Sequence, residues 1–219
     1  MEYRNEVQLE QELRKIAVVP VAVLEEAETV IPIAKALYDG GLPAIEVTFR
    51  TEIAAYAISE IKKNLPDMLV GAGTVLTPEQ VNAAADAGAD FLVSPGFNLR
   101  TLNAAKQRGI PMIPGICTPT EAEAAIEQGI HLVKFFPAEA AGGLAMIKAM
   151  SAPYQMLSFM PTGGISLDNL EKYLSFPKIA ACGGSFMLSK QLLRDRNYTQ
   201  IAAVSRNAAD IAAKVRKEA

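Results

Sequence analysis

The chain has 219 residues, 21 of them basic and 24 acidic, for a net charge of −3, and half of its residues are hydrophobic. This length and composition predict a single domain, spanning residues 1–219, with a large buried core. The slightly acidic balance argues against a nucleic acid or a membrane surface as the main partner.

Cysteine usage and the start of the chain bear on the compartment. Cys117 and Cys182 are the only cysteines, too few for a disulfide framework. The opening residues are polar and charged, without the apolar core of a signal peptide. No apolar run approaches the roughly 18 to 20 residues of a membrane helix. We therefore expect a cytoplasmic protein.

Short apolar or β-branched runs alternate with longer, Ala-rich amphipathic stretches along the chain. The runs predicted to be strands are Ile16–Val23, Ala44–Thr48, Met68–Gly71, Phe91–Val93, Ile110–Ile113, His131–Phe135, Met156–Met160 and Ile179–Ala181. The predicted helices include Glu25–Asp39, Glu52–Asn64, Pro78–Ala87, Leu99–Arg108, Pro119–Gln128 and a last one near Tyr198–Lys217. Several of them end on glycine, and two begin with Thr-Pro, at Thr77–Pro78 and Thr118–Pro119, an N-cap followed by proline in the first turn.

This alternation predicts a parallel α/β sheet. Eight repeats at even spacing favour closure into a (β/α)8 TIM barrel, with an extra helix before the first strand. An open doubly wound sheet is the alternative, but no G-x-G-x-x-G follows the first strand. In such barrels the chemistry lies at the carboxyl ends of the strands, so polar residues at those ends are the candidates for function.

The second predicted strand carries unexpected polar residues. Because side chains alternate along a strand, Glu46 and Thr48 share one face, and Arg50 continues it. A carboxylate within a buried parallel strand is costly without a purpose. The sequence therefore indicates a functional Glu46, and the alternative is a structural Glu46–Arg50 ion pair.

The sixth predicted strand carries Lys134 near its carboxyl end, between apolar neighbours. An apolar environment disfavours the ammonium and raises the fraction of neutral amine, which is the form that a Schiff-base lysine needs. The alternative is a structural lysine that reaches out to the rim. His131, the only histidine, is expected on the opposite face as a surface or structural residue, and a single histidine argues against a zinc site with several His ligands.

Glycine-rich segments follow three predicted strands. Gly71–Thr74 ends the third strand, where glycines allow a substrate to approach the backbone and Thr74 offers a hydroxyl. Pro161–Ile165 and Cys182–Ser185 follow the seventh and eighth strands. Barrel enzymes build phosphate sites from backbone N–H groups in these two loops. A single Gly-Gly pair is also typical of a simple turn, but two at these positions favour phosphate binding.

These motifs, in this order, resemble the bacterial 2-keto-3-deoxy-6-phosphogluconate (KDPG) aldolases, many of which also act on 4-hydroxy-2-oxoglutarate (KHG). The resemblance runs from about Ile16 to Met187 and is most specific around the lysine. The segments that carry it are Glu46–Thr51, Gly71–Leu76, Ser94–Gly96, Ile113–Gly115, Lys134–Glu139, Pro161–Ile165 and Gly183–Ser185.

The resemblance implies a (β/α)8 barrel, a class I (Schiff-base) lyase of the Entner-Doudoroff pathway with no cofactor or metal, and a homotrimer. Its ligands would be a phosphorylated keto-deoxy sugar acid and pyruvate. It also implies roles for nine residues. Lys134 would form the Schiff base, Glu46 would be the general acid and base, and Arg50 and Thr74 would hold the pyruvate carboxylate. Thr162 would lie beside the substrate, and the phosphate would be held by Gly163, Gly164, Gly184 and Ser185.

Three rival functions remain open at the level of sequence. One is an aldolase for the phosphogalactonate epimer, which shares the lysine and the glutamate. Another is a phosphosugar isomerase or epimerase on the same barrel, although such enzymes usually need a histidine or metal partner that this chain does not offer. The third is a barrel that binds phosphosugars without catalysis, since a fold alone does not determine function.

Overall fold

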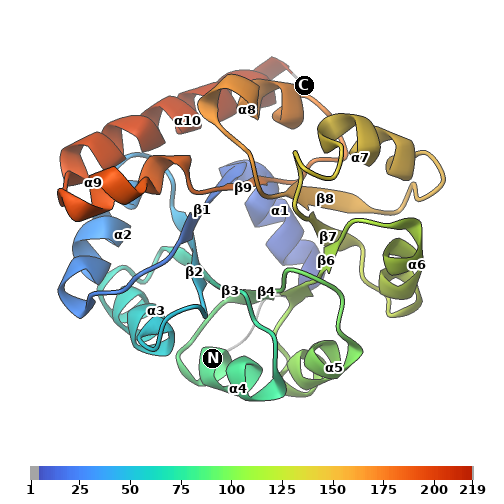
Figure 1. Cartoon of the computed structure of the whole chain (residues 1–219), viewed down its shortest axis with the longest axis horizontal. Helices are drawn as coiled ribbons and strands as arrows, with labels where there is room; N and C mark the ends of the chain where they lie inside the picture. The colour runs from blue at the N-terminus through green and yellow to red at the C-terminus, as the bar shows by residue number, and fades with distance from the viewer. Residues whose placement is uncertain (1–4, 219) are drawn as a thin grey trace.

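The computed structural model describes residues 5–218, so the ends of the predicted domain and the first four residues of the polar start lie outside it. Strands gather at the centre and helices surround them (Figure 1). The strands are β1 (Val18–Ala22), β2 (Ala44–Thr48), β3 (Leu69–Gly73), β4 (Phe91–Val93), β5 (Met112–Ile113), β6 (Gly115–Ile116), β7 (Leu132–Phe135), β8 (Ser158–Pro161) and β9 (Cys182–Gly184). The α-helices are α1 (Glu6–Ile16), α2 (Val30–Asp39), α3 (Ala54–Asn64), α4 (Pro78–Asp86), α5 (Leu99–Arg108), α6 (Pro119–Glu127), α7 (Gly143–Ser151), α8 (Leu167–Leu174), α9 (Lys190–Arg194) and α10 (Tyr198–Glu218), with 3-10 turns η1 (Ala27–Thr29) and η2 (Phe186–Leu188).

All paired strands run parallel, as the alternation of strands and helices predicts. One sheet has the order β5-β4-β3-β2-β1-β9, and a second has the order β6-β7-β8. Two parallel bridges, Phe159 with Ile179 and Thr162 with Gly183, connect β8 to the segment of β9. The carboxyl ends of the strands therefore gather at one end of the molecule.

Two predicted strands differ from the structure. The fifth strand was predicted at Ile110–Ile113. In the structure two short strands occupy this region, β5 before Pro114 and β6 after it, and β5 pairs with β4 whereas β6 pairs with β7. Proline has no N–H for a ladder, but its carbonyl still accepts from the Lys134 N–H at 2.9 Å. The eighth strand was predicted at Ile179–Ala181, whereas β9 begins at Cys182 and contains both glycines.

Most predicted helix boundaries are confirmed within a few residues, and α5 has the predicted bounds. Thr77 and Thr118 cap α4 and α6 with their side chains, each with proline in the first turn. Gly109 ends α5 in the left-handed conformation, with φ of 67°, where a residue with a Cβ would be strained. The stretch predicted as Glu25–Asp39 instead begins with the short turn η1.

The helix predicted before the first strand is α1, which lies across the strands (Figure 1). Its buried Leu9 and Leu13 join a cluster of strand residues that face the interior, among them Phe91, Leu132 and Met160. The Glu6 carboxylate accepts from the backbone N–H of Leu132 at 3.1 Å. A second, larger apolar cluster lies between the strands and the outer helices. The amino end of the interior is thus filled, which leaves the carboxyl end for a site.

Hydropathy along the helices bears on membrane association. Within residues 5–218, no helix is both long enough and apolar enough to cross a membrane.

Candidate active site

A cavity of about 1050 Å³ opens at the carboxyl ends of the strands, and all nine predicted site residues line it. They come from segments far apart in the sequence: Glu46 and Arg50 from β2 and the turn after it, Thr74 after β3, Lys134 from β7, Thr162, Gly163 and Gly164 after β8, and Gly184 and Ser185 at the end of β9. The parallel arrangement gathers these segments, because each strand delivers its carboxyl end to the same place.

Lys134 and Glu46 meet in the floor of this cavity. The Lys134 Nζ lies 3.3 Å from Glu46 Oε1, and the two residues are 5% and 0% exposed. Burial disfavours both charges, and their contact offsets this cost. Glu46 Oε2 is buried and has no hydrogen-bond partner among the described residues. The Phe136 ring lies 5.3 Å from Nζ and adds a cation–π contact.

Arg50 is not the partner of Glu46. Among the described side chains, the ion pair of Glu46 is with Lys134, so the alternative of a structural Glu46–Arg50 pair was wrong. The Arg50 Nε instead donates to Thr48 Oγ1 at 3.3 Å, and the Thr48 hydroxyl donates to the Ala22 carbonyl at 3.1 Å. Arg50 is exposed at the cavity wall, which leaves most of its planar donor fork for a ligand.

The glycine segment after β3 serves a purpose that the sequence did not reveal. A Cβ on Gly73 would overlap Glu46 Oε1, so only glycine leaves space for the buried carboxylate at this position. Thr74 follows with φ of 55°, a left-handed conformation that is rare for a β-branched residue. Such strain persists where the surroundings enforce it, commonly at functional sites.

The other end of the cavity is built from the backbone. Gly163 and Gly164 have φ of 100° and 81°, and this turn leads into α8 through Ser166, whose capping box marks the start of the helix. Gly184 ends β9, the exposed Ser185 follows it, and both line the same cavity. The segment Cys182–Ser185 was predicted as a loop after the eighth strand, but its first three residues form β9. Glycine occurs inside a strand where another group approaches closely, and a Cβ on Gly183 would overlap Thr162 Oγ1.

Glu139 closes the Lys134–Glu139 motif, but the sequence assigned it no role. Its N–H donates to the Gly163 carbonyl at 3.0 Å, and its carboxylate accepts a short hydrogen bond from the Tyr173 hydroxyl of α8. Burial, together with this hydrogen bond, raises the pKa of Tyr173. Glu139 thus links β7, the glycine turn and α8. The place of Glu139 within the Lys134–Glu139 motif was the only available signal, because nothing in the sequence connects it to Tyr173.

His131 lies away from the cavity. It is exposed and precedes β7, and its backbone N–H donates to Glu6 Oε1 at 2.8 Å. This agrees with the expectation of a surface histidine. Within residues 5–218, no group of three or more His, Cys, Asp or Glu residues is arranged to hold a metal ion.

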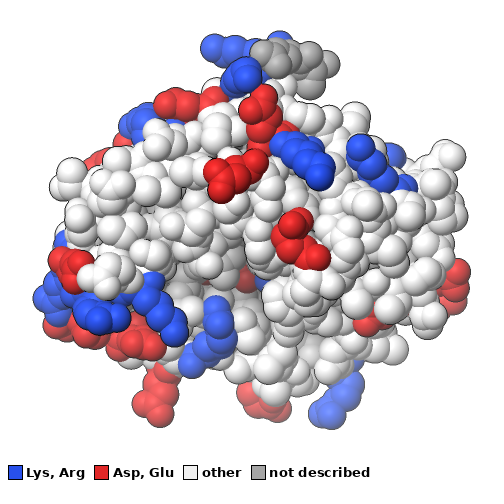
Figure 2. Space-filling model, turned by 45° about the horizontal axis from the view of Figure 1, so that its top comes forward, with Lys and Arg blue, Asp and Glu red and all other residues white. Residues whose placement is uncertain are grey.

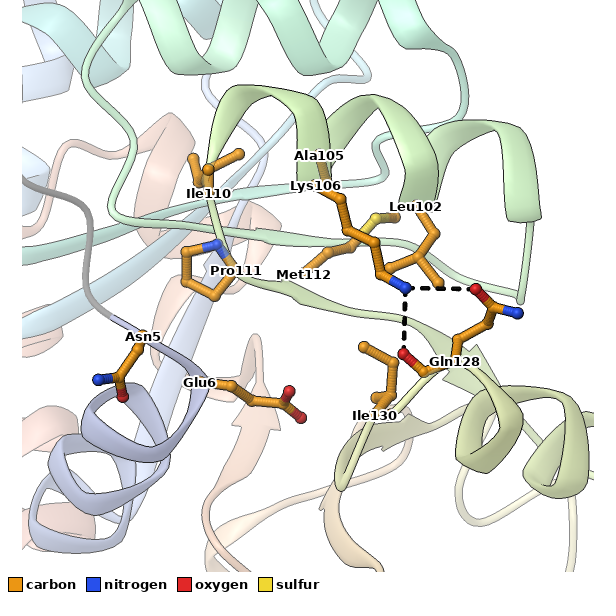
Figure 3. A pocket seen from close by; sticks show the side chains of 12 residues that line it. Asn5, Glu6, Leu102, Ala105, Lys106, Ile110, Pro111, Met112, Gln128 and Ile130 are labelled. Atoms are coloured by element: carbon orange, nitrogen blue, oxygen red, sulfur yellow. Dashed lines mark hydrogen bonds between the residues drawn. The ribbon is translucent and has the colours of Figure 1, made fainter.

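A second cavity, of about 350 Å³, lies near the amino ends of β5 and β7 (Figure 3). Lys106 crosses it and donates from Nζ to the carbonyl and side-chain oxygens of Gln128 at 3.0 and 3.2 Å. Its other walls are mostly apolar, including Leu102, Ile110 and Met112. None of the predicted site residues lines it, and its one amine is already bonded, so the larger cavity is the candidate active site.

Comparisons with known proteins agree on one family. Residues 9–204 match the family model described as KDPG and KHG aldolase. The chain is 48% identical over 199 residues to the 2-dehydro-3-deoxy-phosphogluconate aldolase of Treponema pallidum, covering 91% of this chain and 95% of that protein. It is 42% identical over 193 residues to the KHG/KDPG aldolase of Escherichia coli K12, covering 88% and 91%.

A solved structure gives the same result in three dimensions. The KDPG aldolase of Legionella pneumophila, with pyruvate captured as a covalent carbinolamine intermediate, superimposes with a TM-score of 0.87 at 38% identity. The superposition covers 91% of this chain and 97% of that one. The similarity therefore extends over the strands and loops that form the large cavity.

Proposed function

The chain belongs to the KDPG and KHG aldolase family, and from this premise we propose that it cleaves 2-keto-3-deoxy-6-phosphogluconate through a Schiff base on Lys134. The products are pyruvate and glyceraldehyde 3-phosphate. The relative that is named for both substrates supports a second activity, cleavage of 4-hydroxy-2-oxoglutarate to pyruvate and glyoxylate. The substrate assignment gives the chain a role in the Entner-Doudoroff pathway.

One observation carries the mechanism. A lysine amine and a carboxylate, both buried, lie 3.3 Å apart in a cavity large enough for a sugar acid. The second carboxylate oxygen of Glu46 has no partner among the described residues. A buried polar atom without a partner is costly, so this oxygen is suited to a substrate hydroxyl or to a water that relays its proton.

The reaction begins with proton transfer from Lys134 to Glu46, which frees the amine to attack the keto carbon. Glu46 returns the proton to the carbinolamine hydroxyl, which leaves as water and gives an iminium ion. The iminium accepts the electron pair when the bond between the next two carbons of the chain breaks. Glu46, acting through a water, takes the proton from the hydroxyl beyond that bond, and the aldehyde leaves. The enamine is then protonated, and hydrolysis releases pyruvate and restores Lys134.

The remaining residues hold the two ends of the substrate. Arg50 and Thr74 bind the carboxylate, because a guanidinium presents two parallel donors to two oxygens. Thr162 lies beside the bound chain. The phosphate binds at the glycine turns, where backbone N–H groups can approach an anion without interference from side chains. Support for the phosphate site comes from the pair Gly163–Gly164 facing Gly184 and Ser185 across one cavity.

We also propose a closed (β/α)8 barrel in a single domain that assembles as a cytoplasmic homotrimer. Closure is supported by the continuity of β5 and β6 in the chain and by the parallel bridges between β8 and the β9 segment. An interface is supported by exposed Leu76 and Leu99, 49% and 46% exposed, near which the Thr101 hydroxyl donates to the Leu76 carbonyl at 3.2 Å. Light scattering on the purified protein measures the number of subunits.

Trapping with pyruvate and borohydride tests the proposed function directly. Reduction should add a three-carbon group to Lys134 alone, as read by peptide mass spectrometry, and Lys134→Ala should abolish both labelling and aldol cleavage. Lys148→Ala, which removes an exposed lysine of α7 outside the cavity, is the control and should label normally. A label on any other lysine, or no label, would refute the Schiff base on Lys134.

Comparison of substrates distinguishes the aldolase from its rivals. Pyruvate release is measured with the phosphogluconate-type acid, its phosphogalactonate epimer and 4-hydroxy-2-oxoglutarate. The highest kcat/KM is expected for the phosphogluconate type. Isomerase or epimerase activity without trapping would point to the rival on the same fold.

A further inference from the structure

Three basic side chains line the cavity but take no part in the mechanism above. Lys190 and Arg194 are the first and last residues of α9, and Arg196 follows the helix. All three are exposed, so they lie at the rim, in the same cavity as Ser185. We call Lys190 and Arg194 the α9 pair.

The position of the α9 pair follows from the local fold. Residues four apart in a helix lie on the same face, so Lys190 and Arg194 are neighbours. Ser189 caps this short helix by accepting from the Leu192 N–H at 3.3 Å. The helix starts directly after η2, which itself follows Ser185. Gly184 and Ser185, which belong to the proposed phosphate site, and the α9 pair therefore lie in one continuous segment of the chain.

Arg196 forms ion pairs with two acidic residues from another segment, Glu26 and Glu28. It bonds Glu26 at 2.7 Å and Glu28 at 3.1 Å, and both lie in the segment that follows β1. Figure 2 shows basic and acidic side chains gathered on the side where α9 lies in Figure 1. The hydrogen bond with Glu26, followed by that with Glu28, raises the pKa of Arg196. Arg196 thus links the end of α9 to the segment between β1 and α2 and pairs with two carboxylates.

The α9 pair is left without a counter-charge. Within the described part of the chain, neither Lys190 nor Arg194 forms an ion pair with a carboxylate. The cavity lining has five basic and three acidic residues. Of the acidic ones, Glu46 pairs with Lys134 and Glu26 with Arg196, and only Glu25 stays exposed and unpaired among the described side chains. The rim of the cavity beside Ser185 therefore carries net positive charge.

We propose that the α9 pair is an outer anion subsite that binds the phosphate group of the substrate, alongside the backbone donors of the glycine turns. This inference rests on the proposed function and names a specificity determinant for it. A phosphate monoester carries between one and two negative charges at neutral pH. Backbone N–H groups supply only partial charges, so a lysine and an arginine at the rim supply the full charges that select a phosphorylated substrate.

The test is the double variant K190Q/R194Q, compared with the parent and with K172Q/R100Q. The control removes two exposed basic residues that do not line the cavity, so that both variants have the same net charge. For each protein, kcat and KM are measured at low and at physiological ionic strength. The substrates are the phosphogluconate-type acid and 4-hydroxy-2-oxoglutarate, which has no phosphate.

We expect K190Q/R194Q to lose roughly 3- to 20-fold in kcat/KM on the phosphorylated acid at low salt, mainly through KM, the scale of two exposed charge pairs. The loss should shrink as the screening length falls from about 30 Å to about 8 Å. It should be smaller on 4-hydroxy-2-oxoglutarate. Two single variants separate charge from shape at this position: R194Q removes the charge, whereas R194K retains it and should keep most of the kcat/KM that R194Q loses.

Two kinetic results would overturn the subsite: a loss of kcat/KM no greater than that of K172Q/R100Q, or an equal loss on both substrates. Titration of inorganic phosphate by calorimetry gives a readout that does not depend on turnover, and its affinity should weaken in K190Q/R194Q. If the parent fails to cleave the phosphorylated acid, the proposed function is wrong, whereas the phosphate titration still decides the subsite. Unchanged phosphate affinity in the double variant would refute it.

Discussion

The two ends of the cavity differ in the groups that line them, which are charged side chains at one end and backbone turns at the other. At the reaction end, two charged side chains, Lys134 and Glu46, project from strands and are 5% and 0% exposed. At the proposed phosphate end, glycine turns present the backbone, and Ser185 is exposed. Proton transfer requires groups whose ionisation can change, and burial keeps such a pair in contact. An anion that only needs to be held is better served by fixed N–H donors on a turn.

Glu46→Gln changes the reaction end alone, and we expect it to cause the largest loss of turnover among the variants that compare the two ends. The amide retains the size and much of the hydrogen bonding but cannot accept a proton. We expect turnover to fall roughly 10²- to 10⁴-fold on phosphorylated and unphosphorylated substrates alike, and trapping with borohydride to slow. Glu127→Gln, on the exposed surface of α6, is the control. Loss of folding with normal turnover per folded molecule would instead indicate a structural ion pair.

Ser185→Ala changes the phosphate end alone and should separate the substrates. Loss of a hydrogen bond to a charged group costs about 1.5–3 kcal/mol, or roughly ten- to two-hundred-fold in kcat/KM. We expect this loss on the phosphorylated acid and little change on 4-hydroxy-2-oxoglutarate. Ser175→Ala, an exposed serine after α8, is the matched control. An equal loss on both substrates would mean that Ser185 does not contact phosphate.

Gly73→Ala tests whether space, and not only charge, defines the reaction end. The added methyl would overlap Glu46 Oε1, so the carboxylate must move while its chemistry is retained. Overpacking of this kind costs about 1–3 kcal/mol, and we expect roughly ten- to a hundredfold lower turnover on both substrates. Gly96→Ala is the control, because its Cβ would meet no atom within 4 Å. Similar activity of the two variants would show that Glu46 has room to adjust.

The alternation of strands and helices was predictable because it depends on local patterns. The bounds of β2, β4 and α5 coincide with the predicted ones, since alternating burial, caps and helix-ending glycines are all read within a few residues. The eighth strand was misplaced, because two glycines favour a turn locally. What keeps them in β9 is parallel pairing with β1, Val19 opposite Gly183 and Pro20 opposite Gly184, between segments at opposite ends of the chain.

In the candidate site, too, some features were predictable from local sequence patterns and others depended on tertiary packing. The sequence by itself determined which residues stand at strand ends, including Lys134, Glu46 and the glycine pairs, because a fixed side-chain period and a common strand direction assign them to one end of a barrel. Only the tertiary structure decided their partners. Glu46 pairs with Lys134 and not with Arg50, Glu139 bonds Tyr173, and α9 brings its basic pair to the rim beside Ser185. Such contacts join residues far apart in the chain, and their geometry depends on how the strands and helices pack, which no local pattern specifies.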